Sequence, residues 1–584
     1  MSVASAVLRQ RDQPRPDNDR YKWVVLSNTT LGVLMATIDT SIVLIALPDI
    51  FKGIKINPLQ PGNTFYLLWM ILGFMIVTSV LVVSLGRLGD MLGRVRMYNL
   101  GFVIYTFFSL VLSITWMSGT AAALWLVIMR LFQGVGAAFL IANSTAILTD
   151  AFPERQRGMA IGINQIAGIS GMFIGLVLGG LLGPIQWRLI FIISVPIGLF
   201  GTIWAYLKLR EVPTKRLHHV DWSGNVTFAV GLIALMVGIT YGIQPYGGHA
   251  MGWTSPLVLG SMAIGVLSLA LFARIEIRSD DPMFRLSLFR IRAFSAGSIS
   301  TLLAAIGRGG LMFTMVIWLQ GIWLPLHGFN FSNTPLWAGI ALLPLTGGFL
   351  VAGPLCGFLS DRFGSRPFTV GGMLGATASF LLLQFLPANF SYPVFGLILF
   401  LNGLAMGAFS APNRVSVMNA LPAEHRGVGS GMNSTFQNSG QVVSIGIFFT
   451  LMIIGLSRTL PSALYTGLTH QGVSAHVAHH VAGLPPVTTL FASFLGYNPM
   501  ANLLGPHALA ALSSSARATV VGHTFFPTII QKAFVSGLHP ALDFAAIVCL
   551  LAAVTSWLRG ARETPRTTNA VDSAVDVLSA PDTN

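Results

Sequence analysis

Charged residues are scarce in this chain of 584 residues. Asp, Glu, Lys and Arg make up 9% of it, whereas a soluble domain has about a quarter. Hydrophobic residues make up 53%, and the mean hydropathy is +0.72. This composition argues against a soluble globular protein and indicates a polytopic membrane protein.

Cysteine and the common catalytic motifs are also nearly absent. The two cysteines, Cys356 and Cys549, both lie in apolar segments, which argues against a disulfide framework or a metal cluster. The chain has no catalytic triad, no metalloprotease signature and no glycine-rich loop ending in Lys-Ser or Lys-Thr. We therefore expect no enzyme, no metal and no cofactor, and we expect an ion gradient as the energy source.

Acidic residues are fewer than basic ones, which gives a formal net charge of +14. Most of the basic residues fall in the terminal segments and in alternate loops, so the excess indicates topology and argues against nucleic acid binding. We expect a multi-pass protein of the cell (inner or plasma) membrane with both termini in the cytoplasm. Residues 1–20 are polar and no cleavage site follows, so the first span is interpreted as a retained anchor.

Apolar runs of about twenty residues recur along almost the whole chain and predict fourteen transmembrane helices. The expected spans are 22–48, 65–85, 97–117, 121–146, 158–182, 188–208, 222–243, 254–274, 294–323, 335–359, 367–387, 392–416, 428–455 and 537–559.

Two sets of motifs repeat within the chain. The turn Gly86–Arg96 resembles Gly357–Gly364, and their Asp90 and Asp361 are 271 residues apart. A second set, which includes Gly134 and Asn164, recurs as Gly403 and Asn433 at an offset of 269. Such internal symmetry is typical of secondary transporters, whose substrates bind between the repeats.

The repeat divides the chain into five parts. A cytoplasmic tail (1–21) precedes a six-helix half (22–208). Two inserted transmembrane helices (209–276) separate it from a second six-helix half (277–559), which includes an outer loop (456–536). A disordered cytoplasmic tail (560–584) ends the chain.

Asp39 in the first span is the most informative single residue. A lone carboxylate in hydrocarbon is costly and usually functional, and it can load and release a proton. The alternative is a structural ion pair with Arg130 or Arg308. Arg130 either modulates a nearby carboxylate or satisfies backbone carbonyls.

Several other residues are candidates for a substrate cavity. Arg308 lies deep in the ninth span, where it could contact an anionic head group. Aromatic and amide side chains could surround a lipophilic ligand. The full set of cavity candidates is Asp39, Trp69, Phe74, Gln133, Arg308, Phe313, Trp318 and Gln320.

The outer loop 456–536 contains six histidines, whose spacing matches no standard set of metal ligands. We interpret this loop as an interfacial cap or as a contact for an envelope adaptor.

These motifs together resemble the major facilitator superfamily, and more specifically its fourteen-span drug:proton antiporter branch. The resemblance covers roughly residues 22–455 and the last span. The motifs that carry it are Gly86–Arg94, Asp39-Thr40 with Ala46-Leu47-Pro48, Arg130-x-x-Gln133-Gly134, and Trp187-Arg188 through Val195-Pro196-Ile197-Gly198. The chain departs from this branch at Gly175, which is followed by Leu176 where the antiporter motif has Gly-Pro.

The resemblance implies an all-α membrane protein with the major facilitator fold, in which two six-helix halves rock around a central site. It implies proton coupling through Asp39 and Arg130. It also implies conformational gating by Gly86, Asp90, Gly93, Arg94, Asp361 and Gly175.

The leading hypothesis is a monomeric exporter of lipophilic, often cationic, drugs or metabolites in exchange for protons, with membrane lipids as its other partners. The runner-up is a transporter of lipids or lipid-linked cargo for envelope assembly. A non-transporting sensor or scaffold is the third alternative, and the intact gating turn and Asp39 argue against it.

Overall fold

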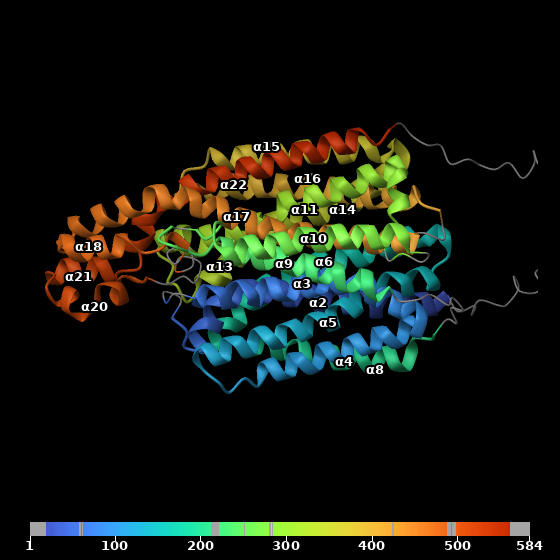
Figure 1. The fold of residues 1–584 in the computed structure, drawn as a ribbon, viewed down its shortest axis with the longest axis horizontal. Coiled ribbons are helices and arrows are strands. Elements are labelled where there is room, and N and C mark those ends of the chain that lie inside the picture. The colour runs from blue at the N-terminus through green and yellow to red at the C-terminus, as the bar shows by residue number, and fades with distance from the viewer. Residues whose placement is uncertain are drawn as a thin grey trace, which may run out of the picture.

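The computed structural model describes residues 19–57, 60, 62–211, 221–249, 251–279, 282, 284–422, 426–487, 492 and 498–560. Within these residues, fourteen helices are long and apolar enough to cross a membrane, which confirms the predicted number of spans. The helices lie roughly parallel along one axis (Figure 1). Of the predicted tails 1–21 and 560–584, residues 1–18 and 561–584 lie outside the described residues, and residues 19–21 belong to the first helix.

The N-terminal half is a bundle whose helices pack directly on one another. Its members are α2 (Asp19–Gly53), α3 (Asn63–Leu92), α4 (Arg94–Ser113), α5 (Gly119–Ala151), α6 (Glu154–Ile185), α7 (Leu189–Ile192) and α8 (Ser194–Lys208). Glycines allow α2 and α6 to approach closely, because a side chain at Gly171, Gly175 or Gly179 would collide with α2.

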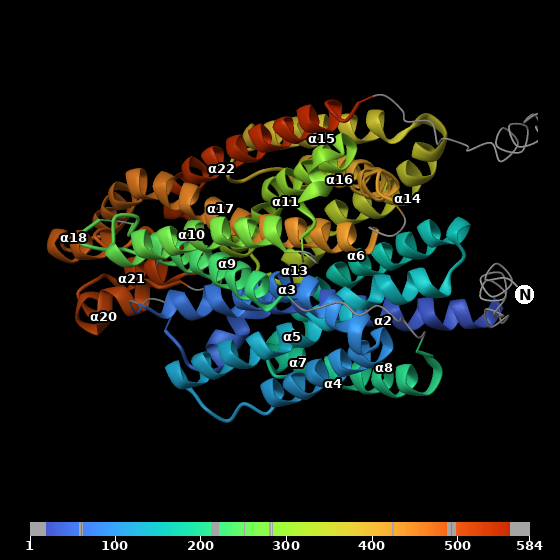
Figure 2. The same cartoon turned by 45° about the vertical axis from the view of Figure 1, so that its right-hand side comes forward.

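The C-terminal half repeats this arrangement with more interruptions. Its membrane elements are α11 (Arg292–Trp318), η2 (Leu319–Trp323), α12 (Leu324–Leu326), α13 (Thr334–Ala341), α14 (Leu343–Phe363), α15 (Ser365–Gln384), α16 (Tyr392–Asn419), α17 (Arg426–His470) and α22 (Phe525–Trp557). The short 3-10 helix η1 (Leu286–Arg290) precedes them. Figure 2 shows this half, in yellow to red, above the blue to teal N-terminal half.

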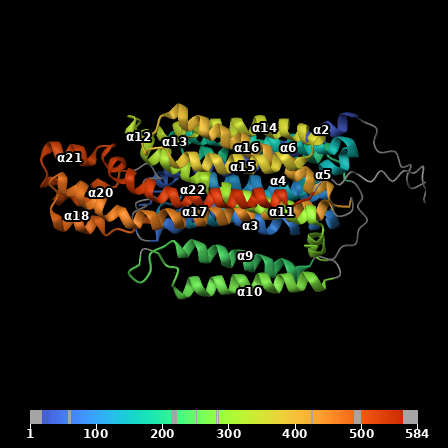
Figure 3. The same cartoon turned by 90° about the horizontal axis from the view of Figure 1, so that it is seen from above.

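The two inserted helices, α9 (Trp222–Gly242) and α10 (Pro256–Arg278), form a hairpin beside the bundle (Figure 3). They pack mainly on each other, and α9 also contacts α3 and α17. An aromatic cluster joins the hairpin to α17, because Phe228 and Phe272 surround Phe284, whose ring lies 6.2 Å from that of Phe436. The hairpin therefore lies outside the space between the two halves.

The largest differences from the predicted spans are in two helices, which corrects the boundaries expected at 455 and 537. Helix α17 continues to His470 and α22 begins at Phe525. The two helices pack closely where Gly455 and Gly537 meet, because any side chain at either position would collide with the opposite backbone. Farther along, a Cβ at Gly467 of α17 would lie 2.6 Å from Ile529 of α22. Residues 456–470 and 525–536 form a lobe with α18 (Ala475–Ala482), α20 (Met500–Ala510) and α21 (Ser514–Val521), which projects from one end of the bundle (Figure 1).

The bundle therefore has two distinct ends. We call the end that carries the lobe the lobe end, and the opposite end, where α2 begins and α22 ends, the terminal end (Figure 1). At the lobe end the two halves touch. A Cβ placed at Gly339 of α13 would lie 2.9 Å from the carbonyl oxygen of Leu176 in α6, and Gln320 donates to the Ile45 carbonyl at 3.4 Å.

Candidate functional site

Asp39 and Arg130 form a buried ion pair within the N-terminal half. Their side chains are 0% and 1% exposed, and Nη1 of Arg130 donates directly to Oδ2 of Asp39. Gln133 joins the pair, because its Nε2 donates to Oδ1 of Asp39 at 3.2 Å and to the Ser109 hydroxyl at 2.8 Å. Of the two partners predicted for Asp39, the structure brings Arg130 to it.

The Arg130 guanidinium makes further contacts besides the one to Asp39. Nη1 donates to Oε1 of Gln133 at 2.7 Å, and Nε lies 3.4 Å from the carbonyl oxygen of Met70. The guanidinium carbon sits 4.4 Å above the centre of the Phe74 ring. A charge out of contact with water needs partners of this kind, since leaving it unpaired is strongly unfavourable. The carboxylate, the amide and the arginine therefore act as one unit.

The local sequence explains this arrangement. Arg130 and Gln133 are three residues apart on α5 and so share one helix face. On the opposite side of α2, Gly175 of α6 lies against the Ile38 carbonyl and the Ser41 hydroxyl, where any Cβ would collide with both. The Asp39 segment is thus held between α5 and α6.

A cavity of about 290 Å³ lies between the two halves. Its wall includes residues of both, and apolar side chains predominate. The polar and charged lining residues are Thr37, Thr40, Ser41, Thr145, Asn164, Gln165, Arg308, Thr346, Asn402, Arg414, Ser434, Gln437, Asn438 and Gln441. Asp39 is not among them, but the next two residues of α2, Thr40 and Ser41, are.

Two of the predicted cavity residues, Arg308 and Phe313, line this cavity. The others lie outside its lining: Asp39, Trp69, Phe74, Gln133, Trp318 and Gln320. Trp318 is fully buried, and its indole donates to the Ala388 carbonyl at 3.2 Å. These aromatic and amide groups mostly fill contacts between helices, so their part in substrate binding stays a prediction.

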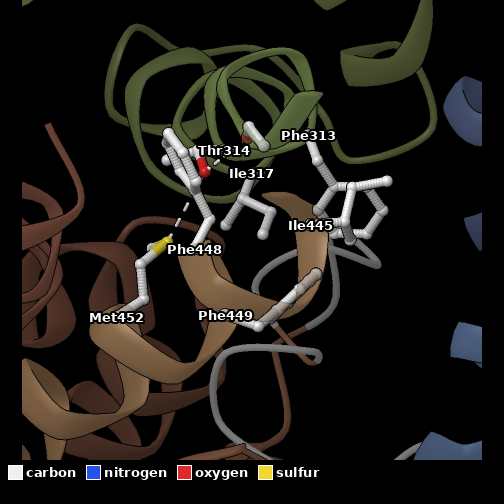
Figure 4. Close-up of a pocket in the computed structure, with 8 residues that line it drawn as sticks. Phe313, Thr314, Ile317, Ile445, Phe448, Phe449 and Met452 are labelled. Carbon is white, nitrogen blue, oxygen red and sulfur yellow. Dashed lines mark hydrogen bonds between the residues drawn. The ribbon is translucent and has the colours of Figure 1, made fainter. Parts of the chain in front are cut away.

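Phe313 also belongs to a closely packed seam between α11 and α17. In Figure 4 the ring of Phe313 lies beside Ile445 of α17. Phe448, Phe449 and Met452, also on α17, line the rest of the seam. The rings of Phe313 and Phe449 make an edge-to-face contact at 4.7 Å. The seam encloses almost no free volume and forms part of the wall of the larger cavity.

The predicted gating turn lies between α3 and α4 at the terminal end. Arg94 donates to Asp90 at 2.7 Å and to Asp150 of α5 at 2.6 Å. Glu211 accepts from the first free amides of α4, those of Val95 and Arg96, at 3.2 and 3.1 Å. Asp150 and Glu211 were not singled out from the sequence, because each follows a span and only the fold brings it to the turn.

Gly93 joins α3 to α4 with φ 110°, and Gly364 joins α14 to α15 with φ 83°. Both helix breaks thus need a backbone conformation that suits glycine. Gly86 makes only an ordinary contact, since a Cβ there would lie 3.6 Å from that of Ala142. The side chain of Asp361, the predicted counterpart of Asp90, lies outside the described structure.

The charged cavity residue that sequence reasoning missed is Arg414 of α16. It was recognised as an arginine within a span but was not assigned to the cavity. Its side chain meets Gln165 of α6, whose amide oxygen, turned toward the guanidinium, accepts from Nη2 at 3.2 Å. The sequence did carry a signal for this residue: an arginine within a membrane span is energetically costly and usually marks a functional site.

Comparison with known proteins agrees with this architecture. The family model of the Major Facilitator Superfamily matches residues 29–445. The riboflavin transporter RibZ of Clostridioides difficile (strain 630) is 29% identical over 433 residues, covering 74% of this chain and 88% of that protein. The tetracenomycin C resistance and export protein of Streptomyces glaucescens is 27% identical over 542 residues, covering 91% of both.

A further relative is the multidrug resistance protein Stp of Mycobacterium tuberculosis (strain ATCC 25618 / H37Rv), which is 29% identical over 446 residues, with 76% of this chain and 78% of Stp covered. Among solved structures, an inward-facing bacterial homologue of the human lysosomal transporter Spinster matches with a TM-score of 0.56 and 17% identity, covering 94% of this chain and all of that one. A D-xylose–proton symporter matches with a TM-score of 0.51 and 15% identity, covering 81% and 97%. The chain belongs to the major facilitator superfamily of membrane transporters.

Proposed function

We propose that this transporter exports lipophilic small molecules across the cytoplasmic membrane in exchange for protons, with both termini in the cytoplasm. The observation that carries the proposal is the buried unit of Asp39, Arg130 and Gln133, one residue away from the cavity wall at Thr40. The names of two relatives, a tetracenomycin C export protein and a multidrug resistance protein, support export as the direction.

Proton uptake by Asp39 would change the contact between α2 and α5. A protonated carboxyl group loses its charge, so Arg130 loses its ion pair and keeps only the amide, carbonyl and ring contacts. Because α2 also lines the cavity and contacts α13 of the C-terminal half, this change reaches both the ligand and the interface between the halves. Protonation and cargo binding are thereby coupled through one helix.

The proton-motive force supplies enough energy for this exchange. One charge moving through 100 mV yields about 2.3 kcal/mol. At tenfold per 1.4 kcal/mol, this sustains a substrate gradient of roughly fifty-fold.

Movement of lipid or lipid-linked cargo is the second candidate. It is favoured by Arg308, which lines the cavity and could pair with an anionic head group. The lobe would then lie where cargo leaves the transporter, and an envelope adaptor could bind there.

The test is transport by the purified protein in liposomes with an imposed pH gradient. Ethidium serves as a lipophilic cation and 1-anilinonaphthalene-8-sulfonate as a lipophilic anion. We expect the gradient to accelerate movement of at least one probe about tenfold, and Asp39→Asn to abolish that acceleration because the carboxyl group is lost.

Asp543→Asn is the matched control. Asp543 lies on α22, is exposed, and accepts from Gln384 at 2.6 Å, far along the chain from the buried unit. This variant should transport like the wild type. Gradient-driven transport that survives in Asp39→Asn would contradict the assigned role of Asp39, and probe movement in the wild type that ignores the gradient would contradict antiport.

A further inference from the structure

Two arginines from the C-terminal half line the central cavity. Arg308 lies on α11 and Arg414 on α16, and both side chains are partly accessible from the cavity. The Arg308 guanidinium lies 5.4 Å from the centre of the Phe349 ring, which also lines the cavity. The Arg414 guanidinium contacts the neutral amide of Gln165 across the interface between the halves. Neither contact neutralises the positive charge.

The described cavity wall contains no acidic residue that could balance these charges. Asp39, the nearest carboxylate along α2, lies behind the wall and is already paired with Arg130. The described cavity lining therefore carries two formal positive charges. Unbalanced charges away from water are costly, and in membrane proteins they usually mark the path or binding site of an ion or substrate.

We propose that the cargo of this cavity is an amphipathic anion, with a carboxylate or phosphate group bound by Arg308 and Arg414. This inference rests on the proposed export function and names its substrate class. Guanidinium groups suit both acids, because their parallel N–H groups match two oxygens of one anion. The expected lipophilic cations would instead meet two like charges in a setting of low dielectric constant.

The rest of the wall suits the apolar part of such a molecule. Met172 of α6, Met312 of α11 and Met406 of α16 line the cavity from both halves. Methionine side chains are flexible and polarisable, so they adapt to hydrocarbon bodies of different shape. The two arginines thus fix the charge of the cargo, whereas the methionines leave its apolar shape open.

Binding of the anion to Arg414 would also affect the interface between the halves. Its amide partner, Gln165, belongs to α6 of the N-terminal half. An anion that binds Arg414 takes the place of a neutral acceptor, and charged acceptors bind guanidinium more strongly than neutral ones do. Cargo binding would therefore loosen a contact that joins α6 to α16.

Binding to the full-length protein in phosphatidylcholine nanodiscs tests the proposal without transport. Three probes share one dansyl-undecyl body: the carboxylate 11-(dansylamino)undecanoate, its neutral primary amide, and the matching trimethylammonium compound. With empty nanodiscs subtracted, the carboxylate should bind at least tenfold more tightly than the ammonium probe. Equal affinity for the two would overturn the proposal.

Arginine variants locate the binding group. Arg308→Met and Arg414→Met should each weaken carboxylate binding about tenfold and leave the neutral amide within about twofold. The conservative variants Arg308→Lys and Arg414→Lys retain the charge and should recover most of the affinity, even if the methionine variants fold poorly. Arg517→Gln, on exposed α21 of the lobe, is the control. Unchanged carboxylate affinity in both folded methionine variants would contradict the assignment.

Competition separates the two sources of the anion. Oleate that displaces the probe at lower concentration than oleoyl lysophosphatidic acid indicates a free carboxylate, and the reverse order indicates a lipid phosphate; both outcomes support an anionic cargo. Binding of the probes needs no pH gradient, so the binding test remains valid even if Asp39 does not couple transport to protons. Gradient-driven ethidium export without anion binding would overturn the anionic cargo and leave proton-coupled export intact.

Discussion

The ion pair of Asp39 and Arg130 is stabilising only while both partners are present. Each charge is almost fully removed from water, so the carboxylate and the guanidinium compensate each other's lost hydration. Removing one partner leaves an unpaired buried charge, whereas removing both leaves neutral groups that can still form hydrogen bonds. This asymmetry can be measured as a difference in stability, separately from transport.

We predict that Arg130→Gln destabilises the protein by about 3–5 kcal/mol, because Asp39 is left as an unpaired buried charge. The double variant Asp39→Asn/Arg130→Gln should recover most of this loss, because no unpaired charge remains. Thermal unfolding of the purified protein at pH 8 measures both variants against wild type. A double variant whose loss equals the sum of the two single losses would show that the groups do not form one unit.

Part of this unit could be predicted from the sequence. The spacing of Arg130 and Gln133 places both on one face of a helix, and Asp39 stands out as a lone acid in an apolar span. The partner of Asp39 could not be chosen between Arg130 and Arg308, because both are arginines within spans. Only the packing of α2 against α5 decides between them.

The cavity lining was harder to predict. Trp69, Trp318 and Gln320 are residue types that often contact ligands. Here Trp69 packs on Phe65 of its own helix, and Trp318 and Gln320 bind backbone carbonyls. Arg414 was visible in the sequence, but its position depends on how α16 faces α6 across the two halves. A contact between residues far apart in the sequence leaves no periodic pattern in either helix.

At the scale of elements, α17 and α22 continue past their predicted spans into the lobe as a packed pair. Leu456, Leu460, Leu464 and Leu468 recur every four residues on α17, and all are at most 2% exposed. The first part of α22 packs on α17, since a Cβ at Gly467 would lie 2.6 Å from Ile529, and the two backbones meet at Gly455 and Gly537. The lobe is therefore an extension of two membrane helices.

The four-residue leucine spacing was the available signal for this extension. Pro461, which usually ends or bends a helix, and polar neighbours such as Arg458 and Ser462 obscure this signal. The helix tolerates the proline because the packing of its leucine face outweighs the lost backbone hydrogen bond. The fourteen membrane segments themselves were predicted correctly, since hydropathy over twenty residues needs no tertiary information.

We predict that Gly537→Leu separates α17 from α22 and destabilises the protein by about 1–3 kcal/mol through overpacking. A Cβ at this position would lie 2.6 Å from the Met452 carbonyl oxygen. Gly371→Leu on α15 is the control, because a Cβ at that position would meet no atom of another helix within 4 Å. Thermal unfolding of both variants is the measurement, and equal melting temperatures would argue against close packing at Gly537.

At the scale of the whole molecule, the two halves meet at the lobe end. Helix α6 of the first half packs on α13 of the second, and Gln320 reaches the Ile45 carbonyl across the same interface. The central cavity lies between the halves and includes residues of both. Alternating access requires this contact to open in part of each transport cycle, so its permanent closure should stop transport.

A disulfide between Leu176→Cys and Gly339→Cys tests this requirement. A Cβ at Gly339 would lie 3.5 Å from that of Leu176, within the 3.5–4.5 Å that a disulfide needs. With Cys356 and Cys549 replaced by serine, we predict that oxidation of this double variant reduces gradient-driven transport at least tenfold and that reduction restores it. Each single cysteine variant, oxidised in the same way, should keep its activity. Full transport by a protein shown to be cross-linked would mean that the lobe end need not open, and the two halves could then not operate by rocking about the central cavity.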